Sequence, residues 1–270
     1  MRPHAEVAID FRPGVTMHYD EAGWRVNPFA PRAGETLPTL GVYGCSFTMG
    51  HALRDEEAYV ALMQKARPDV RFLNRGVAGY GTLQSLLALR QDLADGRIDA
   101  AIFTTISDHR WRNRATPDWL GRLAPAKSAY SGRAIEAYPT AKFDRSGALT
   151  IEYVPLYQPG MNRGDIEVFL PEDHMLDHVL FSLLDEVGRM AAQADLPIQF
   201  AFLDQVDGPL NQLYSEKIPR GLDISVPYDT EHFFIPRNNH PNAHANALYS
   251  ERLLPVIDGL LERSASRGAS

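Results

Sequence analysis

Two patterns of apolar and polar residues alternate along this chain: short continuous apolar runs, and longer segments with apolar residues at helical spacing. Short apolar runs of strand length lie at residues 39–43, 70–74, 99–105 and 198–203, with a weaker one at 222–226. Segments with apolar side chains at helical spacing lie between or beside them, at residues 56–66, 83–93 and 174–194. Strands that alternate with helices are typical of βαβ units, in which helices cover both faces of a parallel sheet. The pattern therefore predicts an α/β fold.

The same spacing predicts which side of each helix is buried. The predicted core-facing residues are Tyr59, Leu62, Met63 and Ala66 in the first helix, Leu83, Leu86, Leu87 and Leu93 in the second, and Leu176, Val179, Leu180, Leu183, Leu184 and Val187 in the third. In parallel sheets of this kind, ligands bind beyond the carboxyl ends of the strands. Ser46, Gly79 and Ser107 all follow predicted strand ends.

Two segments depart from this alternation. The runs "VAIDF" and "VTMHY", with Pro13 and Gly14 between them, predict a small β hairpin near the N-terminus. Residues 113–172 are rich in proline, glycine and arginine and contain one hairpin-like piece, "KFDRSGALTIEY". We interpret the chain as an N-terminal extension (residues 1–35) and one main domain (36–270), whose insertion at about 113–172 lies over the ligand-binding edge and is a candidate lid.

Charge and composition exclude several classes of function. The net charge is −7, and no dense run of lysine and arginine is present, so a nucleic-acid partner is not expected. No stretch approaches the roughly 18 consecutive apolar residues of a membrane span. The N-terminus lacks the apolar core of a signal peptide, and we expect a cytoplasmic protein. The sequence does not indicate an oligomeric state.

Cysteine and histidine usage bears on metals and cofactors. Cys45 is the single cysteine, so an internal disulfide or a cysteine-based zinc site cannot form. The nine histidines include no H-E-x-x-H or comparable motif. These residues thus form no recognisable metal-binding motif, and the serine chemistry considered below requires no metal and no organic cofactor.

Three short stretches carry the candidate chemistry. In "GVYGCSFTMG", Ser46 stands on a turn between a strand and a helix, where a hydroxyl can be exposed as a nucleophile, although G-x-S also occurs in many purely structural turns. In "NRGVAGYG", Gly79 could turn its N–H toward the same volume, or the glycines could merely permit the turn. In "NNHPNAHAN", His240 precedes a helix and could be the base that a serine requires, or only a residue at the helix start.

Taken together, these stretches resemble the SGNH hydrolases, also called the GDSL esterase and lipase family. "GCSFTMG" stands where that family has G-D-S-x-x-x-G, "NRGVAG" resembles its second block, "FTTISDHRWRN" its third, and "HPNAHAN" its last. The resemblance implies a three-layer α/β/α sandwich with a parallel flavodoxin-like sheet. It also implies that Ser46 is the nucleophile, that His240 is the general base and that Gly79 supplies an oxyanion N–H.

The chain departs from the family pattern at three positions. Cys45 replaces the aspartate before the nucleophile, a side chain that does not react. Ser107 stands where the family has its oxyanion asparagine, so that donor is either the Ser107 hydroxyl or Asn113. Arg237 occupies the position of the catalytic aspartate.

Another group must therefore orient His240. The candidates are Asn238, the carboxylates Asp229 and Glu231, and a backbone carbonyl. We favour Asn238 or a backbone carbonyl because both are close in sequence and neither requires the loop to fold back. Asp108 and His109, side by side after a predicted strand, are interpreted as turn and cap residues.

The predicted function is hydrolysis of a carboxylic ester by a Ser–His dyad or an atypical triad. The expected substrate is a small-molecule or carbohydrate ester, such as an O-acetyl or other small acyl ester. One alternative is an acyltransferase that uses the same serine. The other is a non-catalytic binding module, which the missing aspartate and asparagine would suit.

Overall fold

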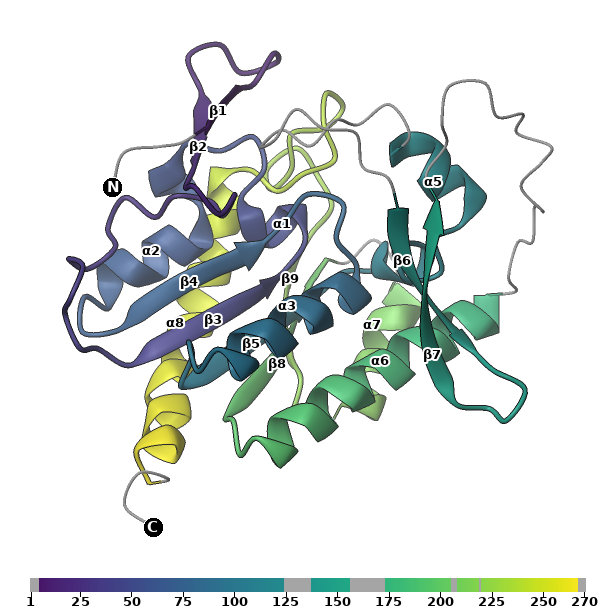
Figure 1. Ribbon diagram of the computed structural model, residues 1–270. Helices are drawn as coiled ribbons and strands as arrows, with labels where there is room; N and C mark the ends of the chain where they lie inside the picture. The colour runs from purple at the N-terminus through teal and green to yellow at the C-terminus, as the bar shows by residue number, and fades with distance from the viewer. Residues whose placement is uncertain (1–4, 124–136, 156–172, 205–207, 219, 267–270) are drawn as a thin grey trace.

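Figure 1 shows the computed structural model of the chain, which describes residues 5–123, 137–155, 173–204, 208–218 and 220–266. A five-stranded parallel sheet forms its centre. Its strands are β3 (Thr39–Gly44), β4 (Arg71–Gly76), β5 (Ala100–Thr105), β8 (Ile198–Asp204) and β9 (Leu222–Val226). Their spatial order is β4-β3-β5-β8-β9. The second strand along the chain thus lies outside the first, which is the flavodoxin-like order, and the predicted sheet is confirmed.

Helices cover both faces of this sheet, so the molecule has three layers (Figure 1). Helices α2 (Tyr59–Ala66) and α8 (Ala243–Ala265) pack on one face, and α3 (Thr82–Ala94), α6 (Asp173–Gln193) and α7 (Gly208–Lys217) pack on the other. Successive strand residues serve opposite cores: Val42 belongs to the first and Tyr43 to the second, and both are fully buried. Strands that are buried on both faces explain the continuous apolar runs in the sequence.

The predicted helix faces are largely correct. In α6, all six predicted residues are at least 98% buried, since the most exposed of them, Leu184, has a relative exposure of 2%. In α2, Ala66 is exposed. The buried side of this helix includes Tyr59, Val60 and Met63 and does not extend to Ala66. Among the described helices, none is long and apolar enough to cross a bilayer.

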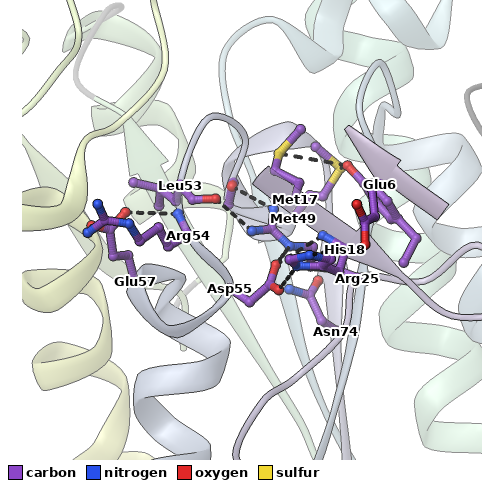
Figure 2. A network of polar contacts seen from close by, with 12 residues as sticks. Glu6, Met17, His18, Arg25, Met49, Leu53, Arg54, Asp55, Glu57 and Asn74 are labelled. Atoms are coloured by element: carbon purple, nitrogen blue, oxygen red, sulfur yellow. Dashed lines mark hydrogen bonds and ion pairs between the residues drawn. The ribbon is translucent and has the colours of Figure 1, made fainter. Parts of the chain in front are cut away.

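The N-terminal hairpin is also present, as strands β1 (Ala5–Ala8) and β2 (Thr16–Tyr19). A buried polar network fastens it to the segment that follows helix α1 (Ser46–Met49), and Figure 2 shows His18 and Arg25 converging on Asp55. His18 Nδ1 lies 2.5 Å from one carboxylate oxygen, and Arg25 Nε donates to the other at 2.7 Å. The Arg25 guanidinium also donates to the carbonyls of Gly50 and Leu53. Because every charged group is paired, the buried cluster holds the hairpin against the main domain.

The region of the insertion contains helices α4 (His109–Asn113) and α5 (Pro117–Leu123) and a hairpin of β6 (Ala137–Phe143) and β7 (Leu149–Pro155). The predicted hairpin is therefore present and begins earlier than "KFDRSGALTIEY". Ala141 on β6 is fully buried in the core that α3 and α6 share. The hairpin is thus part of the folded body, and residues 124–136 and 156–172 of the predicted insertion lie outside the described residues.

A candidate active site at the carboxyl edge of the sheet

Ser46 is the first residue of α1, directly beyond the end of β3. The turn that leads to it requires a glycine, because a Cβ on Gly44 would lie 2.1 Å from the hydroxyl oxygens of both Thr48 and Thr104. Those two hydroxyls are hydrogen-bonded to each other at 2.7 Å beneath the turn. Close packing thus fixes the backbone that presents Ser46.

The hydroxyl of Ser46 faces the imidazole of His240, although the two residues are 194 positions apart. Ser46 Oγ lies 2.8 Å from His240 Nε2. His240 lies on the loop between β9 and α8, and a bridge between Phe233 and Pro241 closes this loop near the histidine. A serine in hydrogen-bond contact with a histidine is the geometry that nucleophilic catalysis requires.

Asn238 determines how the imidazole is protonated. Its Oδ1 accepts a hydrogen bond from the backbone N–H of His240 at 3.0 Å and lies 2.5 Å from Nδ1 of the same ring. Because a backbone N–H can only donate, the side-chain atom that faces it must be the amide oxygen. Nδ1 therefore carries the proton and donates to Asn238, which leaves the lone pair of Nε2 for the Ser46 hydroxyl.

The surroundings of His240 keep its ring neutral. Burial lowers the pKa of His240 to about 3, and the nearby His51 and Arg112 shift it in the same direction. The rings of His51 and His240 are in contact, with centroids 4.3 Å apart. Burial likewise lowers the pKa of His51 to about 4. Both histidines are therefore unprotonated at neutral pH.

This pKa predicts an unusual pH dependence for a reaction in which His240 is the base. The neutral imidazole accepts the proton, so activity is lost only as the pH falls through the pKa of His240. We expect kcat/KM to stay level from pH 8 down to about pH 5, instead of halving near the ordinary histidine value of about 6.5. The measurement is kcat/KM against pH, with circular dichroism at each pH to confirm that the chain is folded. An acid limb near pH 6.5 would contradict this prediction.

Gly79 lies beside this pair and has φ +83°, a conformation that favours glycine. It lines the same cavity as Ser46 and His240. Its carbonyl accepts a hydrogen bond of 3.0 Å from the hydroxyl of Tyr138 on β6, so the hairpin fixes the orientation of this peptide. No hydrogen bond joins the N–H of Gly79 to another residue in the described part of the chain.

Ser107 and Asn113, the two candidate donors of the third block, both have other partners in the structure. The Ser107 hydroxyl donates to Asp204 at 2.9 Å, and the Ser107 N–H points to the same carboxylate. Asn113 is fully buried, and its Oδ1 accepts the N–H of Leu83 in the first turn of α3. Neither residue belongs to the set that lines the cavity of Ser46. The Ser107 hydroxyl is thus engaged by Asp204, whereas Asn113 uses its amide oxygen and its Nδ2 has no hydrogen-bond partner among the described residues, so the oxyanion donor of the third block stays a prediction.

The carboxylates proposed to orient His240 contact other histidines. Asp229 lies 2.7 Å from Nδ1 of His232, and Glu231 lies 3.7 Å from Nδ1 of His244. Of the predicted orienting groups, the structure therefore brings only Asn238 to His240. Asp108 precedes α4 as its N-cap residue and lines the cavity, and His109 is fully buried.

Sequence reasoning missed three residues of this site: His51, Arg112 and Asp204. Arg112 donates to the carbonyl of Tyr80 and to Asp108, and its guanidinium lies over the ring of Trp119. Burial raises the pKa of Asp204 to about 6, against the hydrogen bonds from Ser107. Asp204 ends β8, so the strand-end argument that singled out Ser46 would have found it. His51 and Arg112 carry no such signal.

Two cavities adjoin one another, and Ser46 lines the first of them. The first, of about 620 Å³, has polar and apolar lining in about equal measure and contains Ser46 and His240 together with three arginines, Arg112, Arg122 and Arg237. The second, of about 860 Å³, is lined mainly by apolar and aromatic side chains. Four residues line both cavities: His51, Ala78, Gly79 and Trp119. A bound molecule can therefore extend from one cavity into the other.

The apolar cavity runs along α3. The face of this helix that lines it includes Gln84, Leu87, Ala88 and Gln91, with Asp92 beside the last of them. Residues 84 to 91 span seven helical positions, or about 10 Å of helix. The walls come from the two hairpins, and they include Met17, Tyr19, Tyr138 and Tyr153. We call this cavity the α3 groove.

No family model and no curated protein matches the sequence. Solved structures are similar to the chain at low sequence identity. A lipolytic protein of the G-D-S-L family from Veillonella parvula is 11% identical, with 82% of this chain and 98% of that chain covered and a TM-score of 0.45. The esterase EstA from Pseudoalteromonas sp. is 12% identical, covering 83% and 98% with a TM-score of 0.47. The α/β hydrolase LAE5 from the metagenome of Lake Arreo is 15% identical, covering 86% and 98% with a TM-score of 0.47.

The strand order and the two helical layers establish the fold from the chain's own structure. Ser46, Gly79 and His240 come from three of the four sequence stretches that resemble the SGNH hydrolases, and all three line one cavity. The chain is thus a three-layer α/β/α sandwich with a flavodoxin-like sheet, and its SGNH-like motifs meet at the carboxyl edge of that sheet.

Proposed function

We propose that the protein hydrolyses a carboxylic ester, with Ser46 as the nucleophile and His240 as the general base. The observation that carries this proposal is the hydrogen bond of 2.8 Å between Ser46 Oγ and His240 Nε2, on a ring whose other nitrogen is held by Asn238. A purely structural serine would not need a neutral, oriented histidine beside it. The acyl-ester substrate class rests on the resemblance to the SGNH hydrolases.

In the first step, Ser46 Oγ attacks the acyl carbon while its proton moves to His240 Nε2. The carbonyl oxygen becomes an oxyanion, and the N–H groups of Ser46 and Gly79 donate to it. Arg112 adds a positive charge in the same cavity. The C–O bond of the ester then breaks, and His240 returns the proton to the departing alcohol. Water repeats the sequence on the acyl-enzyme and releases the acid.

The neighbouring cysteine is a poor nucleophile by comparison. The side chain of Cys45 is buried, with a relative exposure of 1% for the residue. Burial raises the pKa of the Cys45 thiol, although Arg112 acts in the opposite direction. The reactive thiolate is therefore disfavoured, which supports the assignment of Ser46.

The two cavities suggest which part of the ester lies where. The apolar α3 groove suits the hydrocarbon of an acyl group, and the arginine-lined cavity suits a polar or anionic alcohol. The size of the groove extends the expected substrates from O-acetyl groups to longer acyl chains. A screen of p-nitrophenyl esters from acetate to decanoate tests the proposed function. If the protein hydrolyses none of these esters, the result contradicts the proposal.

A substitution at the far end of the groove tests this placement. Gln91 is exposed, lines the groove and lies seven residues from Gln84. Gln91→Trp should block the distal end, and lost contact with two methylene groups alone would cost about 1.6 kcal/mol, or about tenfold. We expect the ratio of kcat/KM for octanoate to that for butyrate to fall by that factor, with butyrate turnover unchanged.

Arg90→Trp is the matched control, since Arg90 is exposed on the same helix and lies outside the lining of the groove. It should leave the octanoate-to-butyrate ratio as in the wild type. An equal fall in both variants, or in neither, would show that the acyl chain lies elsewhere.

A polar alcohol in the arginine-lined cavity could also accept the acyl group from Ser46, which would make the protein an acyltransferase. Product analysis with and without an added sugar acceptor separates the two reactions. Free acid as the dominant product in the presence of acceptor is the result expected of a hydrolase.

A further inference from the structure

A second cluster of reactive side chains comes from the loop after β9 and from the first turn of α8, and it takes no part in the mechanism above. Glu231, His232 and His244 each present one ligand atom, and these three atoms lie within 4.8 Å of one another. Glu231 and His232 lie just before the part of the loop that the Phe233–Pro241 bridge closes around His240. His244 lies after it, on the first turn of α8. The cluster thus spans the two ends of that loop.

Asp229 prepares His232 for coordination. Its Oδ1 accepts the backbone N–H groups of Glu231 and His232 at 3.0 and 3.1 Å, and it lies 2.7 Å from His232 Nδ1. Nδ1 therefore carries the ring proton and donates a hydrogen bond to the carboxylate of Asp229, and the lone pair of the ring lies on Nε2. Histidine ligands of metal ions are typically held in this way by a carboxylate that contacts the other ring nitrogen.

The other two ligands are exposed and can adjust. The ring of His244 stacks on that of His232, with centroids 5.0 Å apart and an angle of 20° between the planes. Its Nδ1 lies 3.7 Å from Glu231 Oε1, and the side chain of His244 is 49% exposed. One ligand atom of each residue already lies within 4.8 Å of the other two, and the exposed side chains of His244 and Glu231 can move closer to share one ion. Two imidazoles and one carboxylate form a donor set suited to zinc, with water as a fourth ligand.

The backbone around these ligands is held in place without an ion. The N–H of Asn242 donates to the carbonyl of His232 at 2.8 Å, and its side-chain amide donates to the carbonyl of Glu231 at 2.7 Å. Asn242 Oδ1 also caps α8 by accepting the N–H of Ala245. A site whose ligand-bearing backbone is already ordered loses less entropy when an ion binds.

We propose that Glu231, His232 and His244 bind one divalent zinc ion, that Asp229 orients His232, and that the ion fastens the two ends of the loop that carries His240. The site is separate from the esterase chemistry, which needs no metal. Bound zinc should raise the melting temperature of the protein, because it binds only the folded arrangement.

The test is isothermal titration calorimetry of the full chain, without an affinity tag and after chelator treatment, using Zn²⁺ alone. We expect the titration to give one Zn²⁺ per chain. We also expect thermal unfolding of the same protein to show a higher melting temperature with Zn²⁺ than without it. His244→Ala and Glu231→Gln alter exposed side chains, so they should fold, and each should weaken binding at least about tenfold. Asp229→Asn should weaken it by about tenfold to a hundredfold, as loss of an orienting carboxylate does.

Two controls locate the ion. His178→Ala removes an exposed histidine on α6, and His51→Ala breaks the contact between His51 and His240. Both should bind Zn²⁺ as the wild type does. The proposal is overturned if the wild type binds no Zn²⁺ at sub-millimolar concentration, or if His244→Ala and Glu231→Gln bind as tightly as the wild type, which would place the ion elsewhere.

Discussion

Replacing Ser46 with alanine should lower kcat for a p-nitrophenyl ester by about 10³-fold or more. Nucleophile and base act as a unit, so removal of either one eliminates most of the catalysis they provide together. The substitution removes one hydroxyl and its hydrogen bond to His240, which should change the free energy of unfolding by only about 1 kcal/mol. The measurements are steady-state kinetics and thermal unfolding of both proteins.

A loss of activity counts only if the fold is kept. Ser46→Ala and the wild type should therefore have melting temperatures within a few degrees of each other. Turnover near the wild-type rate in a folded Ser46→Ala protein would remove the serine from the mechanism. It would also favour the alternative that the chain is a non-catalytic binding module.

His240→Ala should cause a loss of the same order, because the variant has no base at Ser46 Oγ. Asn238→Ala should cost less, since the imidazole remains but is no longer held in the tautomer that presents Nε2 to the serine. In the serine-protease case, the wrong tautomer costs up to about 10⁴ in rate. Asp229→Ala should cost far less than His240→Ala, because the carboxylate contacts His232. The measurement is kcat/KM of each variant on one ester.

Asn238→Asp gives a more discriminating result. The aspartate has the same shape and can accept the same two hydrogen bonds, but its negative charge favours protonated His240 and should raise the pKa of the ring. The acid limb of kcat/KM should therefore move to higher pH than in the wild type. An unmoved limb, or full activity in His240→Ala, would show that this histidine is not the base.

The strands and long helices could be predicted from the sequence because each has a strong local pattern. The apolar runs of β3 and β5 are buried on both faces, and the long helix α6 keeps a regular apolar stripe. Helix α7 was not predicted, since "GPLNQLYSEK" has few apolar positions and contacts the core mainly through Leu210 and Tyr214. Local pattern carries little information where only one or two side chains anchor an element.

The candidate site was predictable where a residue type and a turn coincide, as at Ser46, Gly79 and His240. It was not predictable where a side chain's partner is distant in sequence. Nothing local indicates that the Ser107 hydroxyl is occupied by Asp204, 97 residues away, or that the ring of His51 rests on that of His240. The sequence favours Asn238 over Asp229 because Asn238 is only two residues from His240. In the structure, the side-chain amide of Asn238 contacts the imidazole of His240.

Labelling with a fluorophosphonate tests the central claim most directly, because the reagent reacts with an activated serine whether or not the natural ester is known. After digestion and mass spectrometry, the account predicts a single adduct on Ser46, formed much more slowly in His240→Ala. An adduct on Cys45, or no adduct on the folded wild-type protein, would contradict the assignment of Ser46 as the nucleophile.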